Sequence, residues 1–216
     1  MINDRIELVS CLGDEEADIL AEIIKESWNY DIVDKEMMQK RVSSGNLFFV
    51  AYCVNNCSPE CPDKEYMQDT YDKSCIPDSP TGILEAVSLR TTGNMSNIPR
   101  NYDFLTNSGY WSSPEKDVDT LVLADITLLK TRRGKQGMGL AGRMIEFALE
   151  HAKGMKNIEH IWTYTPHSEN IIKWHEKNGA EFSGYIVEDA RPFYRDASKH
   201  QTPNVCIMDY SKLLGR

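Results

Sequence analysis

Apolar residues recur along this chain with the spacing of helices in some segments and of strands in others. From Asp14 the run DEEADILAEIIKESW repeats isoleucines behind an acidic first turn, which predicts an amphipathic helix over 14–28. A second, shorter helix is predicted over 34–42. The segment 139–154, GLAGRMIEFALEHAKG, keeps its apolar residues on one face and ends at Gly154, which predicts a third helix.

Runs of β-branched and aromatic residues predict five strands, over 46–54, 81–90, 120–129, 158–166 and 205–213, and 5–10 is a candidate for a further one. The first two of the five are expected to pair antiparallel. A short helix is predicted over 168–180, closed by Asn178 and Gly179. This order predicts an α/β fold with a mixed, mostly antiparallel central sheet and helices on both faces.

Two long irregular stretches interrupt the pattern. Residues 55–80 carry four prolines, three cysteines and six acidic residues against two lysines, with no period that could bury a face, and we interpret them as an inserted loop. Residues 91–118 form a second insertion. Its aromatic residues indicate an ordered loop, because side chains of that size are rarely left in water: Tyr102, Phe104, Tyr110 and Trp111. We expect one domain over 1–216 that contains both insertions.

Charge and composition limit the classes of partner that the protein is expected to bind. A formal net charge of -9 argues against nucleic acid, which requires a cationic surface, and suits a cationic or neutral ligand better. No apolar run approaches the roughly 20 residues that span a bilayer, and the first ten residues are too polar for a signal peptide, so we expect a cytoplasmic protein without membrane contact. Four cysteines, at 53, 57, 61 and 75, lack the close pairs of most zinc modules, and we expect free thiols and no metal site.

The stretch TRRGKQGMGLAGR, residues 131–143, joins a predicted strand to a predicted helix. Such a turn presents backbone N–H groups at a helix N-terminus, where the dipole favours an anion. A nucleoside-triphosphate loop is excluded, because no Gly-Lys is followed by Ser or Thr at the required place. Gly137, Gly139 and Gly142 satisfy the dinucleotide pattern G-x-G-x-x-G, but the acid expected about 20 residues later is absent. A charged turn without a ligand is the remaining alternative.

Two segments resemble the GCN5-related N-acetyltransferases (GNAT). ITLLKTRRGKQGMGLAGRMIEFAL resembles the family's strand, Q/R-x-x-G-x-G/A turn and helix, with Gly137 and Gly139 as the terminal pair. Gly134 then stands where the family has Gln or Arg; either it supplies its N–H, or one residue is inserted and Arg133 takes the cationic role. NIIKWHEKNGAEFSG resembles a second family element, with Asn170 at the cofactor-contacting asparagine and His175 at the usual tyrosine.

The resemblance implies an acetyl-CoA-dependent N-acetyltransferase, in which a primary amine attacks the thioester directly. A catalytically silent acyl-CoA-binding module of the same fold is the alternative. The acceptor is expected to be a small-molecule or peptidyl amine, in a pocket built by the first two predicted helices and the loops, including the 91–118 loop. A homodimer stays open. The cofactor residues implied are Asn170, the backbone of Thr127, Leu128 and Leu129 for the pantetheine arm, and, for the pyrophosphate, Arg133, Gly134, Lys135, Gln136, Gly137, Met138, Gly139 and Leu140.

The resemblance also suggests the catalytic groups. His175 is the candidate acid for the leaving thiolate, and Asp125 is the first candidate for the base that accepts the ammonium proton. Glu85, on the neighbouring predicted strand, is the second candidate. A structural role for each of these residues, and a water relay in place of a base, remain open alternatives.

Overall fold

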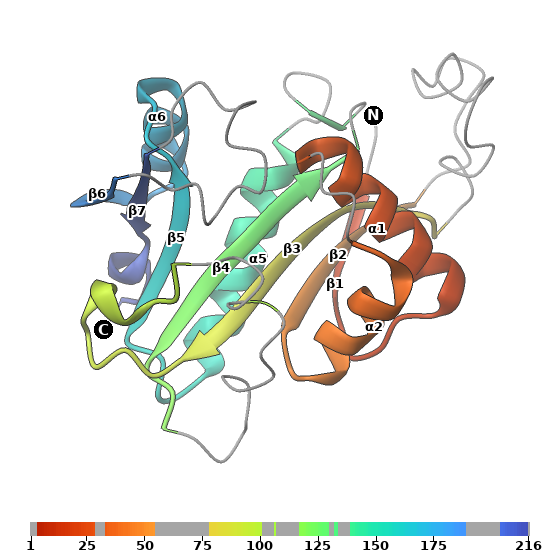
Figure 1. Cartoon of the computed structure of the whole chain (residues 1–216), viewed down its shortest axis with the longest axis horizontal. Coiled ribbons are helices and arrows are strands. Elements are labelled where there is room, and N and C mark those ends of the chain that lie inside the picture. The colour runs from red at the N-terminus through yellow and green to blue at the C-terminus, as the bar shows by residue number, and fades with distance from the viewer. Residues whose placement is uncertain are drawn as a thin grey trace. The chain divides into compact units, whose positions relative to one another are not determined.

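The computed structural model describes residues 4–28, 33–54, 78–100, 106, 117–129, 132–133, 139–188 and 204–215. Its strands form a seven-stranded sheet in the order β1-β2-β3-β4-β5-β7-β6 (Figure 1). β1 pairs with β2, β5 with β7 and β6 with β7, all antiparallel, whereas β4 and β5 are parallel. The predicted mixed α/β sheet is confirmed. The strands are β1 Asp4–Val9, β2 Leu47–Cys53, β3 Pro80–Leu89, β4 Thr120–Leu128, β5 His160–Pro166, β6 Glu181–Val187 and β7 Val205–Asp209.

The helices agree closely with the sequence-based expectations. They are α1 Asp14–Trp28, α2 Lys35–Ser43, α5 Leu140–Gly154 and α6 Glu169–Lys177, with 3-10 turns η1 at Met95–Asn97 and η4 at Ser211–Leu214. In the part of the chain that the structure covers, no helix is both long and apolar enough to cross a membrane. The cysteines at 57, 61 and 75 and the aromatic residues of the 91–118 insertion lie outside the described residues.

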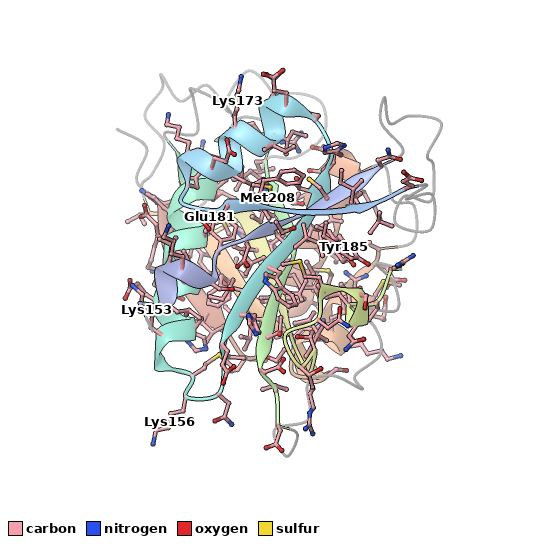
Figure 2. All side chains as sticks on the ribbon, turned by 90° about the vertical axis from the view of Figure 1, so that its left-hand side faces the viewer. Lys153, Lys156, Lys173, Glu181, Tyr185 and Met208 are labelled. Carbon is pink, nitrogen blue, oxygen red and sulfur yellow. The ribbon has the colours of Figure 1, made fainter. Side chains whose placement is uncertain are left out.

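Strand β6 was not predicted from the sequence. It pairs with β7 at the end of the sheet, with Glu181 opposite Asp209 and Phe182 opposite Met208, and Figure 2 shows Glu181 and Met208 on these two neighbouring strands. Its apolar residues Phe182 and Ile186 are exposed, and Gly184 has a φ of +76° where the register shifts. An edge strand with an exposed face and a glycine bulge lacks the alternation by which strands are recognised.

The chain divides into two compact units according to its internal contacts. The first comprises residues 1–43, 47–84 and 125–147, and the second comprises 44–46, 85–124 and 148–216. The expectation of a single domain over 1–216 stays a prediction.

In the first unit, β2 is covered on both faces. Tyr52 donates a hydrogen bond to Glu16 of α1, which places α1 on one face of the strand. Phe49 points to the opposite face and meets the ring of Phe147 of α5 edge-on, with ring centroids 6.0 Å apart. Because neighbouring strand residues of opposite parity point to opposite faces, α1 and α5 lie on opposite sides of β2.

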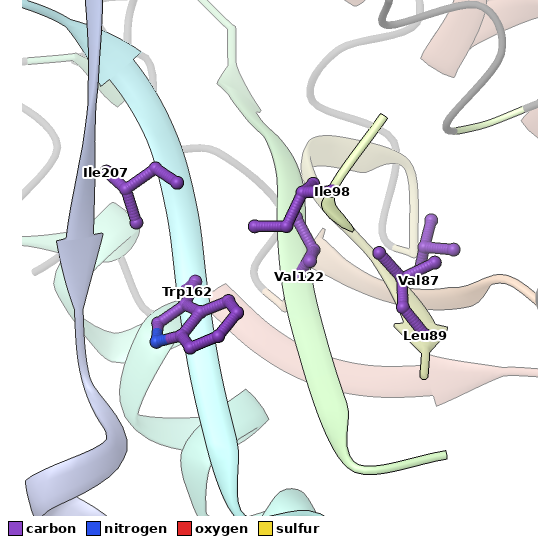
Figure 3. Packing of buried hydrophobic residues seen from close by; sticks show 6 residues of the cluster. All are labelled: Val87, Leu89, Ile98, Val122, Trp162 and Ile207. Atoms are coloured by element: carbon purple, nitrogen blue, oxygen red, sulfur yellow. The ribbon is translucent and has the colours of Figure 1, made fainter. Parts of the chain in front are cut away.

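In the second unit, one apolar cluster joins β3, β4, β5, β7 and the start of the 91–118 insertion. We call it the Trp162 cluster; Figure 3 shows its buried members Val87, Leu89, Ile98, Val122, Trp162 and Ile207. Ala124 and Tyr164 are partly buried against it. Ile98 belongs to the loop that follows β3, so the cluster ties the beginning of this insertion to one face of the strands.

The carboxylate of Asp119 joins the two ends of the 91–118 insertion. It accepts hydrogen bonds from the backbone N–H groups of Thr91, at 2.8 Å, and Thr92, at 2.6 Å, and from the hydroxyls of Thr91 and Thr120. Thr92 has a φ of +55°, a left-handed conformation that these bonds help to hold. Burial acts to raise the pKa of Asp119, but the hydrogen bonds from Thr91, Thr120 and Thr92 outweigh it and lower that pKa.

We expect Asp119→Asn to lower the free energy of unfolding by about 2 kcal/mol at pH 7, because hydrogen bonds to a charged acceptor are lost or weakened. The lowered pKa means that this stabilisation is present above the ordinary aspartate value and is lost as the pH falls through the folded-state pKa. Urea denaturation at pH 7 and pH 3 tests this. The matched control is Asp117→Asn, since Asp117 is exposed and lies 3.9 Å from Arg90. Equal losses in the two variants at pH 7 would contradict the assignment.

Candidate active site

The glycine-rich segment is described at its two ends, Arg132–Arg133 and Gly139–Leu140, while Gly134, Lys135, Gln136, Gly137 and Met138 lie outside the described residues. Gly139 has a φ of +76°, and its carbonyl accepts the N–H of Arg143 at 3.0 Å in the first turn of α5. A side chain in this left-handed conformation would cost about 1–2 kcal/mol, which explains the glycine. The segment therefore leads directly into a helix N-terminus, a preferred position for an anion.

Arg133 is held between β4 and α1. Its Nε donates to the carbonyl of Leu128 at 2.9 Å, and its Nη2 donates to the hydroxyl of Ser27. Ser27 in turn donates to the carbonyl of Ile23 at 2.7 Å. The guanidinium thus already contacts the strand end that the resemblance assigns to the pantetheine arm.

The three residues expected to bond the pantetheine differ in where their backbone groups point. The N–H of Leu129 donates to the carbonyl of Thr81 in β3, at 2.9 Å. Backbone groups alternate in direction along a strand, so those of Thr127 also point toward β3 and those of Leu128 point away from it. The bond from Arg133 to the Leu128 carbonyl agrees with this alternation. Of the three residues, Leu128 is the one whose backbone N–H and C=O groups point away from β3.

The parallel pairing of β4 with β5 covers only the first part of each strand. It joins Thr120–Leu123 to His160–Thr163, and the hydroxyl of Thr163 donates to the carbonyl of Leu123 at the last pair, at 2.8 Å. β4 nevertheless continues to Leu128, and β5 continues to Pro166 while paired with β7. Beyond Leu123, the edge of β4 that faces away from β3 is not in the ladder with β5.

Glu85 is fully buried in β3, in the second unit. Asn46 donates through its amide to Oε1 of Glu85, at 2.6 Å, and to the backbone carbonyl of Thr106, at 2.7 Å. Thr106 belongs to the 91–118 insertion and is also buried. Asn46 therefore connects the Glu85 carboxylate to the 91–118 insertion.

Asp125 and Glu85 lie in neighbouring strands but belong to different units. Val122 and Ala124 of β4 belong to the Trp162 cluster in the second unit, whereas Asp125 is the first residue of β4 that belongs to the first unit. There its Oδ1 accepts the hydroxyl of Thr127, at 2.7 Å. Glu85 precedes Val87 by two positions in β3, which places it on the face of the cluster, together with Thr106. The two candidate bases have different partners, Thr127 for Asp125 and Asn46 for Glu85.

His175 is buried in α6, and both of its ring nitrogens meet hydroxyl groups. Nδ1 lies 2.7 Å from the hydroxyl of Tyr210, and Nε2 lies 3.1 Å from the hydroxyl of Thr165. Burial lowers the pKa of His175 from 6.5 to about 4 and raises that of Tyr210. At neutral pH the ring is therefore a neutral imidazole that can donate one N–H.

The described candidates fall into the two units as follows. The first unit brings Asp125 to Thr127 and Arg133 to Leu128, and it contains Gly139 and Leu140. Glu85, Asn170 and His175 belong to the second unit, where Asn170 is exposed in the first turn of α6. Asn46 and Thr106 were missed in the sequence, because they lie 39 positions before and 21 after Glu85 and no periodic pattern marks an amide or a carbonyl as its partner.

Solved structures with the same fold are GCN5-related N-acetyltransferases and their relatives. The loading GNATL domain of CurA from Lyngbya majuscula has a TM-score of 0.62 at 12% identity, over 99% of this chain and 100% of that one. NAA60 from Arabidopsis thaliana in complex with acetyl-CoA has a TM-score of 0.60 at 13% identity, over 96% of this chain and 98% of that one. An aminoglycoside 6'-N-acetyltransferase complexed with coenzyme A has a TM-score of 0.56 at 10% identity, over 95% of each chain. No protein-family model and no curated protein matches the sequence. The chain has the GNAT fold.

Proposed function

We propose that this protein is an acetyl-CoA-dependent N-acetyltransferase that acts on a primary amine. The observation that carries the proposal is the end of the β4–β5 pairing at Leu123, just before the strand leads into the glycine-rich turn and α5. A strand edge outside the ladder with β5 can offer backbone groups to the amides of a pantetheine arm, and a helix N-terminus suits a pyrophosphate. Solved structures with this fold include complexes with acetyl-CoA and with coenzyme A, which supports the same cofactor here.

In the proposed reaction, the amine nitrogen attacks the thioester carbonyl carbon, the C–N bond forms and the C–S bond breaks. A cationic amine first loses one proton to a base and attacks as the neutral amine. Its nitrogen loses a second proton as the amide forms, the thiolate of CoA takes up one proton, and one proton in total is released to solvent. We assign the base to Glu85 rather than Asp125, because Glu85 shares its face of the sheet with the acceptor loop through Asn46 and Thr106. We assign His175 a positioning role, because burial keeps its imidazole neutral.

The cofactor residues follow the same proposal. The backbone of Leu128 is the proposed partner of the pantetheine arm, with Arg133 and the segment from Gly134 to Leu140 at the pyrophosphate and Asn170 as a further contact. The acceptor is proposed to be a cationic amine, because the chain carries a net charge of -9 and one structure with this fold is an acetyltransferase of aminoglycosides.

Isothermal titration with acetyl-CoA, followed by release of free CoA thiol in the presence of a library of primary amines, tests the proposal. We expect saturable binding at submillimolar cofactor and amine-dependent thiol release. Binding without release above the hydrolysis blank for any amine would indicate a silent acyl-CoA-binding module instead. Absence of binding would overturn both.

A further inference from the structure

Asp4, in the first strand, contacts two arginines that bracket the glycine-rich segment. Its carboxylate Oδ1 lies 3.4 Å from Nε of Arg132, at the start of the segment. Its backbone carbonyl accepts Nη2 of Arg143, in the first turn of α5, at 2.7 Å. These arginines are 128 and 139 positions away in the sequence, so only the fold brings them to one residue.

The ion pair between Asp4 and Arg132 is shielded from solvent. Both side chains are almost fully buried, at 4% and 0% exposure. The hydroxyl of Thr81 donates to the same Oδ1, at 3.0 Å, and Nη2 of Arg132 lies 3.8 Å from Sγ of Cys53, which is paired with Asp4 across β1 and β2. A buried ion pair adds little net stability compared with apolar residues, but it fixes geometry, since either charge alone in this position is costly.

Asp4 thereby holds Arg132, near the start of the glycine-rich segment, and Arg143, in the first turn of α5. Backbone N–H groups bind an anion well only when they are already oriented, because any ordering on binding subtracts from the affinity. We propose that Asp4 is a positioning residue for the pyrophosphate of the cofactor, acting through Arg132 and Arg143 and not by direct contact. This inference rests on the proposed function.

Two variants and two acyl donors test the inference. Arg143→Met removes the bond to the Asp4 carbonyl and leaves no buried charge alone, whereas Asp4→Asn removes the charge opposite Arg132 and is the variant at risk of misfolding. Each is compared with the wild type using acetyl-CoA and S-acetylpantetheine, which lacks the pyrophosphate. We expect kcat/KM for acetyl-CoA to fall about 10-fold or more, mostly through KM, and that for S-acetylpantetheine to change less than about 2-fold.

Tyr52→Phe is the matched control, because it removes the bond to Glu16 on the opposite face of the same strand pair. It should lower Tm without changing the ratio between the two donors. If Arg143→Met, folded as judged by its Tm, loses activity equally with both donors or loses none with acetyl-CoA, the positioning role is overturned. If the wild type neither binds nor uses acetyl-CoA, the proposed function fails instead, so the two failures are distinguishable.

Discussion

Glu85→Gln is expected to lower kcat/KM for the acceptor amine by about 100- to 10,000-fold, the range typical of a lost general base. Glutamine keeps the shape of the side chain and an oxygen that can accept the amide of Asn46, but it cannot take a proton. The stability of the variant should therefore stay close to that of the wild type. Steady-state rates of thiol release with the best amine of the library, together with the Tm of each protein, give the measurement.

Asp125→Asn is the control for this experiment. Asp125 is buried like Glu85, and it also lies in a central strand, but its carboxylate accepts the hydroxyl of Thr127. We expect its kcat/KM to stay within a few-fold of the wild type. The opposite result, a large loss in Asp125→Asn and a small one in Glu85→Gln, would return the role to Asp125. Small losses in both would indicate that a water relay accepts the proton.

The choice between the two carboxylates shows what strand alternation can reveal. Periodicity in the sequence identified β4 and placed Asp125 at a buried position, and both are correct. Seven of the nine residues of β4 are buried, however, from both parities, because both faces of this strand are covered. Alternation then separates the two faces but does not say which of them meets the 91–118 insertion. Only the bonds from Asn46 to Glu85 and Thr106 distinguish them.

Other elements were predictable to different degrees for equally physical reasons. The bounds of α1 match the prediction, because an acidic first turn and regularly spaced isoleucines are local signals. β6 escaped prediction because its apolar residues are exposed and Gly184 interrupts it. The contact of Asp4 with Arg132 and Arg143 has no local signal, since it depends on the pairing of the first strand with distant segments.

His175 is expected to make the stability of the protein depend on pH between about 6.5 and about 4. Its folded-state pKa, lowered by burial to about 4, lies below the ordinary 6.5, so the unfolded chain binds the proton more readily in this interval. The stabilisation from keeping the ring neutral is complete above 6.5 and is lost as the pH falls. A difference of this size corresponds to about 3 kcal/mol.

His175→Gln removes this titration while retaining an amide that can bond to Tyr210 or Thr165. The variant should be less stable than the wild type by about 1–3 kcal/mol at pH 7, because one hydroxyl loses its partner. As the pH falls to 4, only the wild type is destabilised by protonation of a buried ring. The free energies of unfolding of the two proteins should therefore converge. His167→Gln is the control, since His167 is only partly buried and stacks against Phe182; its unfolding free energy should run parallel to that of the wild type.

The same variant separates the two roles of His175 in the proposed reaction. Burial lowers the pKa of His175 to about 4, so its ring is neutral at pH 7, which argues for positioning over donation of a proton to the thiolate. A positioning residue held by Thr165 and Tyr210 predicts a reduced kcat in His175→Gln with an unchanged pH profile between 5 and 8. Disappearance of an alkaline limb from the kcat profile of the variant would instead assign the leaving-group proton to His175, because only a group that titrates during turnover produces such a limb.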